Sequence, residues 1–508
     1  MPHDLQLSAL TMASYLYIAS SASLAVIVYA AFKLIEHRRF YANLLFGDIV
    51  KLFPAGTHPQ YFYTYLSRKY SLPDVWYVDL WPIGPQQVVI TGPDAAAQVT
   101  AIRSYPMHPE VNRFLAPMIG DNVIAATNGP LWKKLHHMMA PAFTPRYVKT
   151  LLSTIADEVM LFHGRLRELA KAGDVFSMER RAVETQFRRH CWNPITKIQA
   201  WWSRRQAIKR SDIFLQKRLV ERYRVMKNEK NIPTRQSARS ILDRILLERI
   251  ENNGDAVEQP LGQDFLELAL TKCLSLKALL IGGHGTTTDT LSFVYMMLGL
   301  HPEVLQRLRQ EHDQVFAPSL TATRKILQDN PAKTNELEYT SAVIMETLRI
   351  FPVGFSIRES PPNEPNLQFK SRSFPTAGQM IVLCQHATHF DPKNYVEPSS
   401  FVPDRFLSSY DGPKPHRFAW RPFERGPRAC MGQELAMDEM RIILLMTVRW
   451  FDLEAVVRPE SISKEPRVSY TDWDTKIGDL AFQELKMGAS PRNGMAMHAK
   501  MSGTAPSS

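Results

Sequence analysis

The chain has 508 residues, of which 45% are hydrophobic and 22% are charged, so its composition is that of an ordinary globular protein. Its four cysteines (Cys191, Cys273, Cys384 and Cys430) show no C-x-x-C spacing, which argues against a disulfide framework and for a reducing compartment. The net charge of +11 suits an acidic partner or an anionic membrane surface. Because no helix-turn-helix, zinc-finger or RNP pattern accompanies that charge, we expect no nucleic-acid partner.

The first predicted element is a membrane anchor at 12–32, which follows a short tail at 1–11. The segment has no charged residue and is long enough to cross a bilayer, which takes roughly 20 apolar residues. A cleaved signal peptide is the alternative. Such a peptide requires basic residues ahead of its apolar segment, and no Lys or Arg precedes this one. Lys33, Arg38 and Arg39 follow it, so the positive-inside rule leaves the rest of the chain in the cytosol.

After a linker at 33–59, the periodicity predicts one folded domain at 60–497. Two runs of β-branched and aromatic residues within 74–93 predict a β-hairpin. From there the apolar spacing is mostly helical, for example at 278–300 and 303–316. The sequence therefore predicts a mainly α domain with a small β portion.

The C-terminal part of the chain continues this pattern. An alternating run within 366–385 predicts short strands, and the apolar spacing of 432–451 predicts a long helix. The last residues, 498–508, are small and polar and predict a disordered tail.

The stretch FERGPRACMG at 423–432 is the strongest chemical signal. A lone cysteine in an apolar setting is usually a core residue, but Gly426 and Gly432 flank Cys430 and allow tight turns whose amide N–H groups can point at the sulfur. Arg428 is spaced to reach an anionic group at the edge of a cofactor, and Phe423 would cover the sulfur. The predicted helix after the loop places its positive end near the sulfur and favours a thiolate.

This loop resembles the haem-thiolate loop of the cytochromes P-450, F-x-x-G-x-R-x-C-x-G. The resemblance implies that Cys430 is the axial ligand of the iron of haem b, and that Phe423, Gly426, Arg428 and Gly432 belong to the cofactor site. It implies the cytochrome P-450 fold, a helical bundle around the haem behind an N-terminal transmembrane helix. The sequence looks most like the fungal members that serve secondary metabolism, including mycotoxin-like pathways.

Three charged residues match two further motifs of that family. Glu346 and Arg349 form E-x-x-R, and Arg405 lies in FVPDRF, which is similar to F-x-P-E-R-F with Asp404 in place of Glu. A surface pair at this spacing is worth a few tenths of a kcal/mol. The apolar neighbours predict burial instead, and a buried pair needs further partners. The resemblance implies that Glu346, Arg349 and Arg405 interlock to hold the haem loop, with a structural rather than a catalytic role.

The stretch GGHGTT at 282–287 resembles A-G-x-D/E-T-T on the helix over the haem. The resemblance implies that Thr286 supplies a hydroxyl for a proton relay, and a shift of register by one places Thr287 there, so both threonines are candidates. The family's acid falls at Gly285, so His284, Asp289 or water would serve the relay. A glycine-weakened helix without a catalytic role is the alternative, since glycine costs roughly 1 kcal/mol in a helix.

The propionate groups of the haem have three candidate ligands besides Arg428. Trp132 matches the first residue of the family's W-x-x-x-R, and His136 stands where the arginine is usual, with His137 as the neighbouring alternative. Arg358 follows the E-x-x-R helix at the distance of a propionate-binding arginine, whose planar fork matches a carboxylate. The alternative for Trp132 and His136 is a core tryptophan beside a solvated histidine.

One region departs from the family's pattern. At 187–192 several dozen residues that the family normally has are missing, which indicates a deletion or an error in the gene model. The lost segment would leave apolar surface uncovered, at a cost comparable to the few kcal/mol of net stability of a domain. A transcript that reads continuously from Glu184 to Trp192 would remove the gene-model explanation.

The resemblance implies a monooxygenase of the endoplasmic reticulum membrane that inserts one oxygen atom from O2 into a small apolar substrate. Its electrons would come from NADPH through an NADPH–cytochrome P-450 reductase. Its anchor would contact membrane lipid. Two alternatives remain open: a haem-thiolate isomerase or dehydratase that needs no external electrons, and a catalytically inactive haem protein. Binding of nucleic acid through the basic stretch 198–250 is the least favoured alternative, since a solvated helical face explains those charges.

Overall fold

The computed structural model describes residues 57–79, 85–121, 123–178, 263–456, 482–486 and 488–503, with scattered helical positions from 206 to 247 and at 473 and 477. The predicted anchor at 12–32, its preceding tail and the predicted gap at 187–192 lie outside these residues. Within the described stretches, no helix combines the length and the apolar character that crossing a membrane requires.

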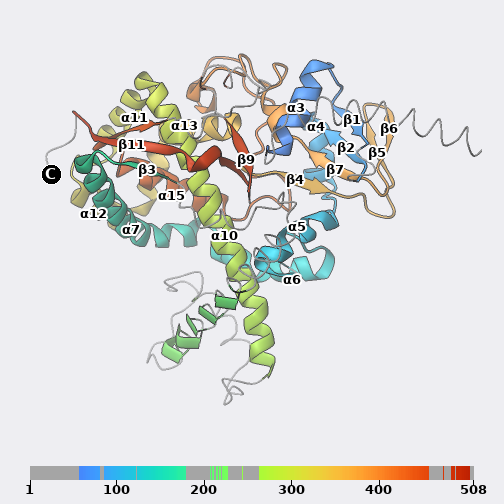
Figure 1. Cartoon of the computed structure of the whole chain (residues 1–508), viewed down its shortest axis with the longest axis horizontal. Helices are drawn as coiled ribbons and strands as arrows, with labels where there is room; N and C mark the ends of the chain where they lie inside the picture. Colours follow the sequence, from blue (N-terminus) through green and yellow to red (C-terminus); the bar gives the residue numbers. More distant parts are fainter. Residues whose placement is uncertain are drawn as a thin grey trace, which may run out of the picture. The chain divides into compact units, whose positions relative to one another are not determined.

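The described residues are mainly helical, as predicted, and the helices alternate with short strands (Figure 1). Proline occupies the first turn of many of them, where its missing N–H costs no hydrogen bond. The helices are α3 (Pro59–Lys69), α4 (Pro93–Ala97), α5 (Pro109–Ile119), α6 (Gly129–Met139), α7 (Pro145–Ala172), α10 (Gln263–Leu300), α11 (Pro302–Val315), α12 (Leu320–Asp329), α13 (Glu338–Ile350), α14 (Gln385–His389) and α15 (Gln433–Leu445). Short helical turns are η2 (Gln98–Ile102), η3 (Ala140–Phe143), η6 (Pro331–Glu336), η7 (Pro403–Phe406) and η10 (Arg492–Gly494).

The hairpin predicted within 74–93 is present. Strands β1 (Val75–Val78) and β2 (Gln87–Ile90) pair antiparallel, and β2 continues into a sheet with β7 (Met380–Leu383) and β4 (Ser356–Arg358). All of β2 is buried, because the sheet separates two apolar clusters. The strands predicted within 366–385 are confirmed by β7 and by the hairpin of β5 (Asn366–Phe369) and β6 (Arg372–Pro375).

The prediction of a disordered tail at 498–508 is wrong for the residues that the structure describes. Strand β11 (Ala496–Met501) lies between β8 (Phe451–Ala455) and β3 (Val175–Ser177), both antiparallel to it. Met497 and Ala499 are fully buried in this sheet, whereas His498 between them is half-buried and Lys500 is exposed. The short β9 (Gln483–Leu485) and β10 (Ala489–Pro491) form a separate hairpin just before it.

The helix predicted over 432–451 is shorter than expected. It ends at Leu445, and the chain turns before β8 begins at Phe451. The Thr447 hydroxyl donates to the Ile443 carbonyl at 2.6 Å and so satisfies one of the carbonyls left free at the helix end. Tyr295 of α10 meets the same hydroxyl at 2.7 Å, which fixes the turn against the central helix.

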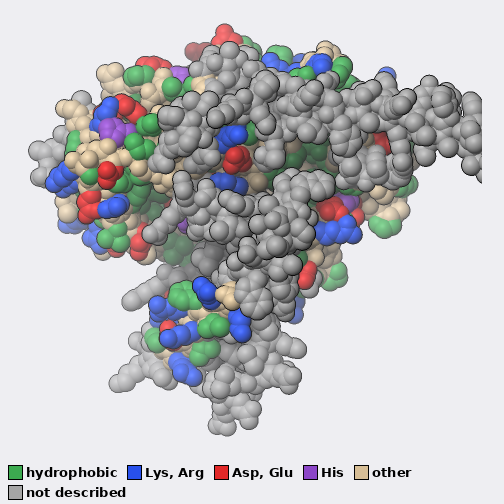
Figure 2. All heavy atoms as spheres, in the orientation of Figure 1, with side chains coloured by type: hydrophobic (Ala, Val, Ile, Leu, Met, Phe, Trp, Pro, Cys, Tyr) green, Lys and Arg blue, Asp and Glu red, His purple; other side chains and the backbone are tan. Residues whose placement is uncertain are grey.

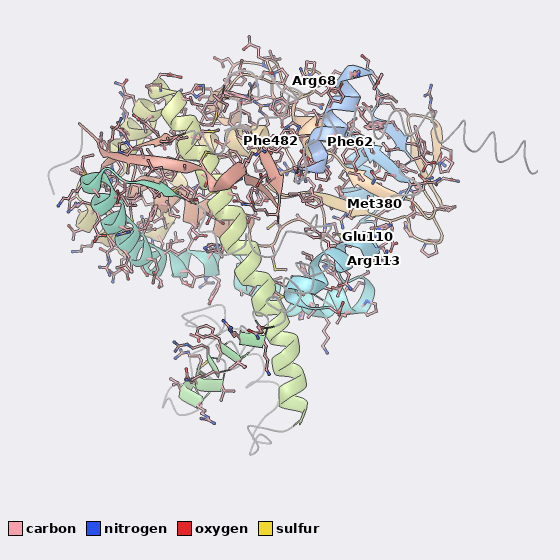
Figure 3. The ribbon with its side chains drawn as sticks, viewed as in Figure 1. Phe62, Arg68, Glu110, Arg113, Met380 and Phe482 are labelled. Carbon is pink, nitrogen blue, oxygen red and sulfur yellow. The ribbon has the colours of Figure 1, made fainter. Side chains whose placement is uncertain are left out.

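Helix α3 covers the first sheet from the N-terminal side of the domain. Its Phe62 packs with Met380 against the apolar cluster around β2 and β7. Tyr61 stacks on Phe482, with ring centroids 5.8 Å apart, and Figure 3 shows Phe482 beside the helix that carries Phe62 and Arg68. The helix thereby joins the sheet to the segment just before β9.

The central core lies where α10, α13 and α15 pack together. Phe293 of α10 stacks on Phe351 at the end of α13, with ring centroids 4.4 Å apart. Buried residues of α15 such as Met440 and Leu444 belong to the same cluster.

On the face drawn in Figure 2, positive and negative side chains are interspersed over the described surface.

A carboxylate in an apolar cleft gives a first testable prediction. Glu439 of α15 lines a cavity of about 290 Å³ beside α7, together with Ile155, Phe162 and Ile443. Burial raises the pKa of Glu439 from 4.5 to about 7. Because the folded-state pKa exceeds the unfolded one, folding favours the protonated form, and this contribution is lost as the pH rises from 4.5 through 7. The loss amounts to at most about 3 kcal/mol.

We therefore expect Glu439→Gln to raise the free energy of unfolding at pH 8 and to change it little at pH 4.5. Denaturant unfolding at both pH values checks this, with Glu434→Gln as the control, since Glu434 is exposed on the same helix. Equal stabilisation at both pH values would show that packing, rather than charge, explains the effect.

Candidate metal centre

The loop 423–432 is held by its own backbone. The Cys430 N–H donates to the Phe423 carbonyl at 2.8 Å, and the Ala429 N–H donates to the Gly426 carbonyl at 2.9 Å. Gly426 has a φ of +85°, and a Cβ there would lie 2.7 Å from the Cα of Ala101 in η2. The loop therefore turns tightly against η2, and only glycine fits that turn.

The sulfur of Cys430 is accessible on one side, although protein surrounds it closely. Its side chain is exposed, yet burial raises the pKa of the thiol. The Gly432 N–H lowers that pKa but does not outweigh burial. A metal cation at the sulfur would supply the missing stabilisation of the thiolate.

Gly432, unlike Gly426, has an ordinary backbone conformation and room for a Cβ. Its φ is −87°, and a Cβ would lie 3.8 Å from the Cys430 sulfur, an ordinary van der Waals distance. The structure therefore gives no conformational reason for glycine at this position.

Arg428 lies on one side of the loop among polar and aromatic groups of the α6 region. Its Nη2 donates to Asn128 Oδ1 at 2.9 Å, and its guanidinium lies 4.4 Å from the ring centroid of Trp132. Burial, followed by the charge of Arg358, lowers the pKa of Arg428 to about 10. His136 lies 4.9 Å from Trp132 between ring centroids, while His137 is exposed.

Arg358 is 1% exposed and is the second cation of the site. It contacts the Tyr105 carbonyl at 3.5 Å and the Met107 sulfur at 2.7 Å, and its Nε has no partner among the described residues. Burial, followed by the charge of Arg421, lowers the pKa of Arg358. A buried guanidinium without a carboxylate is costly and indicates an anionic ligand.

These features fit a cofactor that carries both a metal and carboxylates. Within the described part of the chain, neither Arg358 nor Arg428 has a carboxylate partner, whereas haem b brings two carboxylates. No group of three or more His, Cys, Asp or Glu side chains there is arranged to hold a metal ion. A cofactor that brings its own metal ligands, as an iron porphyrin does, fits the sulfur of Cys430.

Glu346, Arg349 and Arg405 form one buried network. Glu346 accepts two hydrogen bonds from Arg349, both 2.8 Å long, one from Arg405 at 3.1 Å and one from the Val402 N–H at 3.0 Å. Glu346 and Arg349 are 0% exposed and Arg405 is 3% exposed. Asp404 points elsewhere and pairs with Arg307 at 2.6 Å on the surface.

The network reaches the metal loop through His389, which the sequence did not point to. His389 Nδ1 lies 2.9 Å from the Arg349 carbonyl, and its Nε2 accepts from the Arg421 N–H at 3.2 Å. This pattern requires a neutral ring protonated on Nδ1, and burial lowers the pKa of His389 to about 3. His389 thus joins the helix of the charged network to Arg421, which lies two residues before the loop.

The threonines predicted on α10 have different surroundings. Thr286 donates to the Gly282 carbonyl at 2.5 Å, whereas Thr287 is 5% exposed and its hydroxyl has no partner among the described residues. His284 is exposed. Asp289 is buried and accepts from Ser490 of β10 at 2.7 Å, so another group already engages the nearest acid on this helix.

The structure brings most of the predicted site residues into two groups. One joins Cys430, Phe423, Gly426 and Gly432 in a single loop, and the other joins Arg428 with Trp132 and His136. Two further contacts were not predicted: Asn128 accepts from Arg428 in the second group, and His389 links Arg349 to Arg421. Only Asn128 carries a local signal, since it directly precedes the Gly-Pro that starts α6 and occupies its N-cap position.

A family model and several known proteins match this chain over most of its length, and all of them are cytochromes P-450. A family model described as cytochrome P-450 matches residues 194–472. The cytochrome P-450 monooxygenase acrF of Aspergillus aculeatus is 30% identical over 501 residues, covering 88% of this chain and 98% of the relative. The cytochrome P-450 monooxygenase polC of Polytolypa hystricis is 27% identical over 492 residues, covering 88% of this chain and 86% of the relative. The cytochrome P-450 monooxygenase ptmJ of Penicillium ochrochloron is 25% identical over 457 residues, covering 84% and 87%.

Proposed function

The chain belongs to the cytochrome P-450 family of monooxygenases, and on that premise we propose that it is a membrane-anchored enzyme that oxygenates a small apolar molecule. The observation that carries the proposal is the accessible sulfur of Cys430 in a glycine-turned loop, flanked by two guanidiniums without carboxylate partners. A haem-thiolate centre is the cofactor that uses both features.

Different residues would bind the iron and the carboxylates of the haem. Cys430 would ligate the iron, with Phe423 and Gly426 shaping the loop and Gly432 directing its N–H to the sulfur. Arg358 and Arg428 would pair with the haem carboxylates. Trp132 and His136 would line the same edge of the haem. When bound, the haem supplies the activation of O2, while the protein provides orientation and excludes competing reactions.

The charged network of Glu346, Arg349 and Arg405 is proposed to hold the loop and not to take part in the reaction. Its contacts are to backbone and to other charged groups, and His389 transmits its position to Arg421.

Thr286 and Thr287 are proposed to deliver protons from α10. The surroundings of Thr287 favour it for this role, because its buried hydroxyl has no partner among the described residues and is available to a ligand or a water. Thr286 already donates to Gly282, but its oxygen can still accept a hydrogen bond.

This assignment gives a prediction that separates the two threonines. Thr287→Val keeps the shape but removes the unpartnered hydroxyl, so we expect a several-fold loss of product formed per NADPH consumed, within the roughly 10²-fold range of a single proton-transfer group. Thr286→Val should change this ratio less. Product and NADPH are measured together under substrate saturation, and the reverse order would assign the relay to Thr286.

The proposals for membrane location, electron supply and substrate class rest on the family and on the sequence of the N-terminal segment. We propose a single-pass protein of the endoplasmic reticulum membrane, anchored by 12–32, that receives electrons from NADPH through a partner reductase. The substrate is proposed to be a polyketide-type or other secondary-metabolite intermediate, in keeping with the fungal origin of the relatives named above.

A missing segment near 187–192 is part of the proposal. The alignment with acrF extends over 501 residues but uses 88% of this chain, so the relative has several dozen residues without a counterpart here. The family match begins at residue 194, directly after the predicted gap. The shortfall against acrF supports a deletion or a gene-model error, and we place it at 187–192 because the sequence departs from the family's pattern there.

The test is turnover in membranes that contain the full chain and an NADPH-dependent reductase. Substrate-dependent consumption of NADPH and O2 is the expected result. Turnover without NADPH would instead identify an isomerase or dehydratase, which the glycine at position 285 and the engaged Asp289 favour as the second candidate. Normal haem content without any turnover would identify an inactive protein.

A further inference from the structure

The Glu424 carboxylate of the metal loop lies among several guanidiniums. Glu424 accepts hydrogen bonds from Arg421 Nη2, from Gln385 Nε2 at 2.9 Å and from the Arg425 N–H at 3.3 Å. The Arg421–Glu424 ion pair is almost fully buried, since the two side chains are 1% and 10% exposed. The guanidiniums of the cluster are those of Arg358, Arg421, Arg425 and Arg428.

The backbone of Glu424 is held in an uncommon conformation. Its φ of +58° lies in the left-handed region, which residues other than glycine rarely adopt. Its N–H donates to the Arg421 carbonyl at 3.0 Å, so backbone and side chain both bind Arg421. Such strain persists where the surroundings fix it, and it often accompanies a functional site.

The charges in the cluster depend on one another. Among the described residues, Glu424 is the group whose charge favours the cationic form of Arg358, while Arg421 opposes it. The same two residues act on Arg425, since Glu424 favours its cationic form and Arg421 opposes it. Without Glu424, Arg421 would be a buried cation beside Arg358, and its Nε and Nη1 already lack partners among the described residues.

We propose that Glu424 is a positioning residue for the cofactor: it neutralises Arg421, leaves Arg358 and Arg428 available for the haem carboxylates, and lowers the reduction potential of the iron. This inference rests on the proposed haem function. A negative charge near a redox centre disfavours the gain of an electron, and in a buried site water screens that effect weakly. The loop therefore sets the potential through a residue that touches neither the iron nor the substrate.

The test compares two variants that remove the same charge from Arg–Glu pairs of the same i,i+3 spacing. Glu424→Gln removes it from the buried pair, and Glu168→Gln removes it from the exposed pair with Arg165 on α7. We expect Glu424→Gln to shift the midpoint potential of the haem to more positive values and to speed haem dissociation about tenfold, as loss of a charged hydrogen bond implies. Glu168→Gln should match the unchanged chain in both.

A double variant separates charge from shape. Arg421→Gln combined with Glu424→Gln removes one positive and one negative charge, so the potential should return toward that of the unchanged chain. This comparison also decides the case if Glu424→Gln retains no haem.

Two results would overturn the inference. One is an unchanged potential in Glu424→Gln, whether or not that variant is less stable. The other is a double variant whose potential differs from that of the unchanged chain as much as that of the single variant. Absence of haem from the unchanged chain would instead overturn the proposed function itself, and the inference with it.

Discussion

Glu346→Ala should unfold or severely destabilise the domain, with a loss of about 3–5 kcal/mol, because it leaves buried cations without their counter-charge. Glu346 accepts from Arg349, from Arg405 and from the Val402 N–H, and all three donors lose their acceptor together. Arg349 keeps its bonds to backbone carbonyls, but those cannot offset a buried charge. Denaturant unfolding and the haem content of purified protein measure the effect.

The matched control is Asp404→Asn. Asp404 lies one residue before Arg405 and also pairs with an arginine, but its side chain is 37% exposed, and surface pairs are worth about 1 kcal/mol or less. We expect it to lose little stability and no haem. If Glu346→Ala and Asp404→Asn had similar small effects, the buried network would not support the loop.

Gly426→Ala should disrupt the metal loop while the rest of the domain stays folded. Alanine at a φ of +85° is strained, by about 1–2 kcal/mol, and its Cβ would meet the backbone of Thr100 and Ala101 in η2. Backbone atoms cannot move aside as a flexible side chain can, so the loop must shift and carry Cys430 with it. We expect most of the haem to be lost, with far-ultraviolet circular dichroism nearly unchanged.

Gly432→Ala is the control on the other side of Cys430. Its φ of −87° suits any residue, and the nearest atom to a Cβ, the sulfur itself, is 3.8 Å away. We expect this variant to retain haem and a thiolate spectrum. Greater haem loss in Gly432→Ala than in Gly426→Ala would mean that close approach of the cofactor, and not the backbone turn, selects glycine in this loop.

The sequence predicted the parts of the site whose residues are close together in the chain. The loop around Cys430 and the E-x-x-R pair are contiguous patterns, and each needs only one turn or one helix to bring its residues together. Arg405 was predicted because it has a motif of its own. In each case local backbone geometry, which sequence spacing reflects, determines the contact.

The contacts that were missed join segments far apart in the chain. Asn128 reaches Arg428, and His389 joins Arg349 to Arg421, yet neither lies in a pattern that differs from an ordinary cap or a buried histidine. The strand residues from His498 to Met501 were predicted as part of a disordered tail for a related reason. The small and polar residues of β11 favour a strand only because β8 and β3 lie on either side of it.

The central claim, that Cys430 ligates a haem iron, is tested most directly by the reduced, carbon-monoxide-bound difference spectrum of the full chain expressed in membranes. We expect a thiolate-type Soret band that disappears in Cys430→Ala. Absence of a haem band, or a band of a non-thiolate ligand that survives in Cys430→Ala, would contradict it.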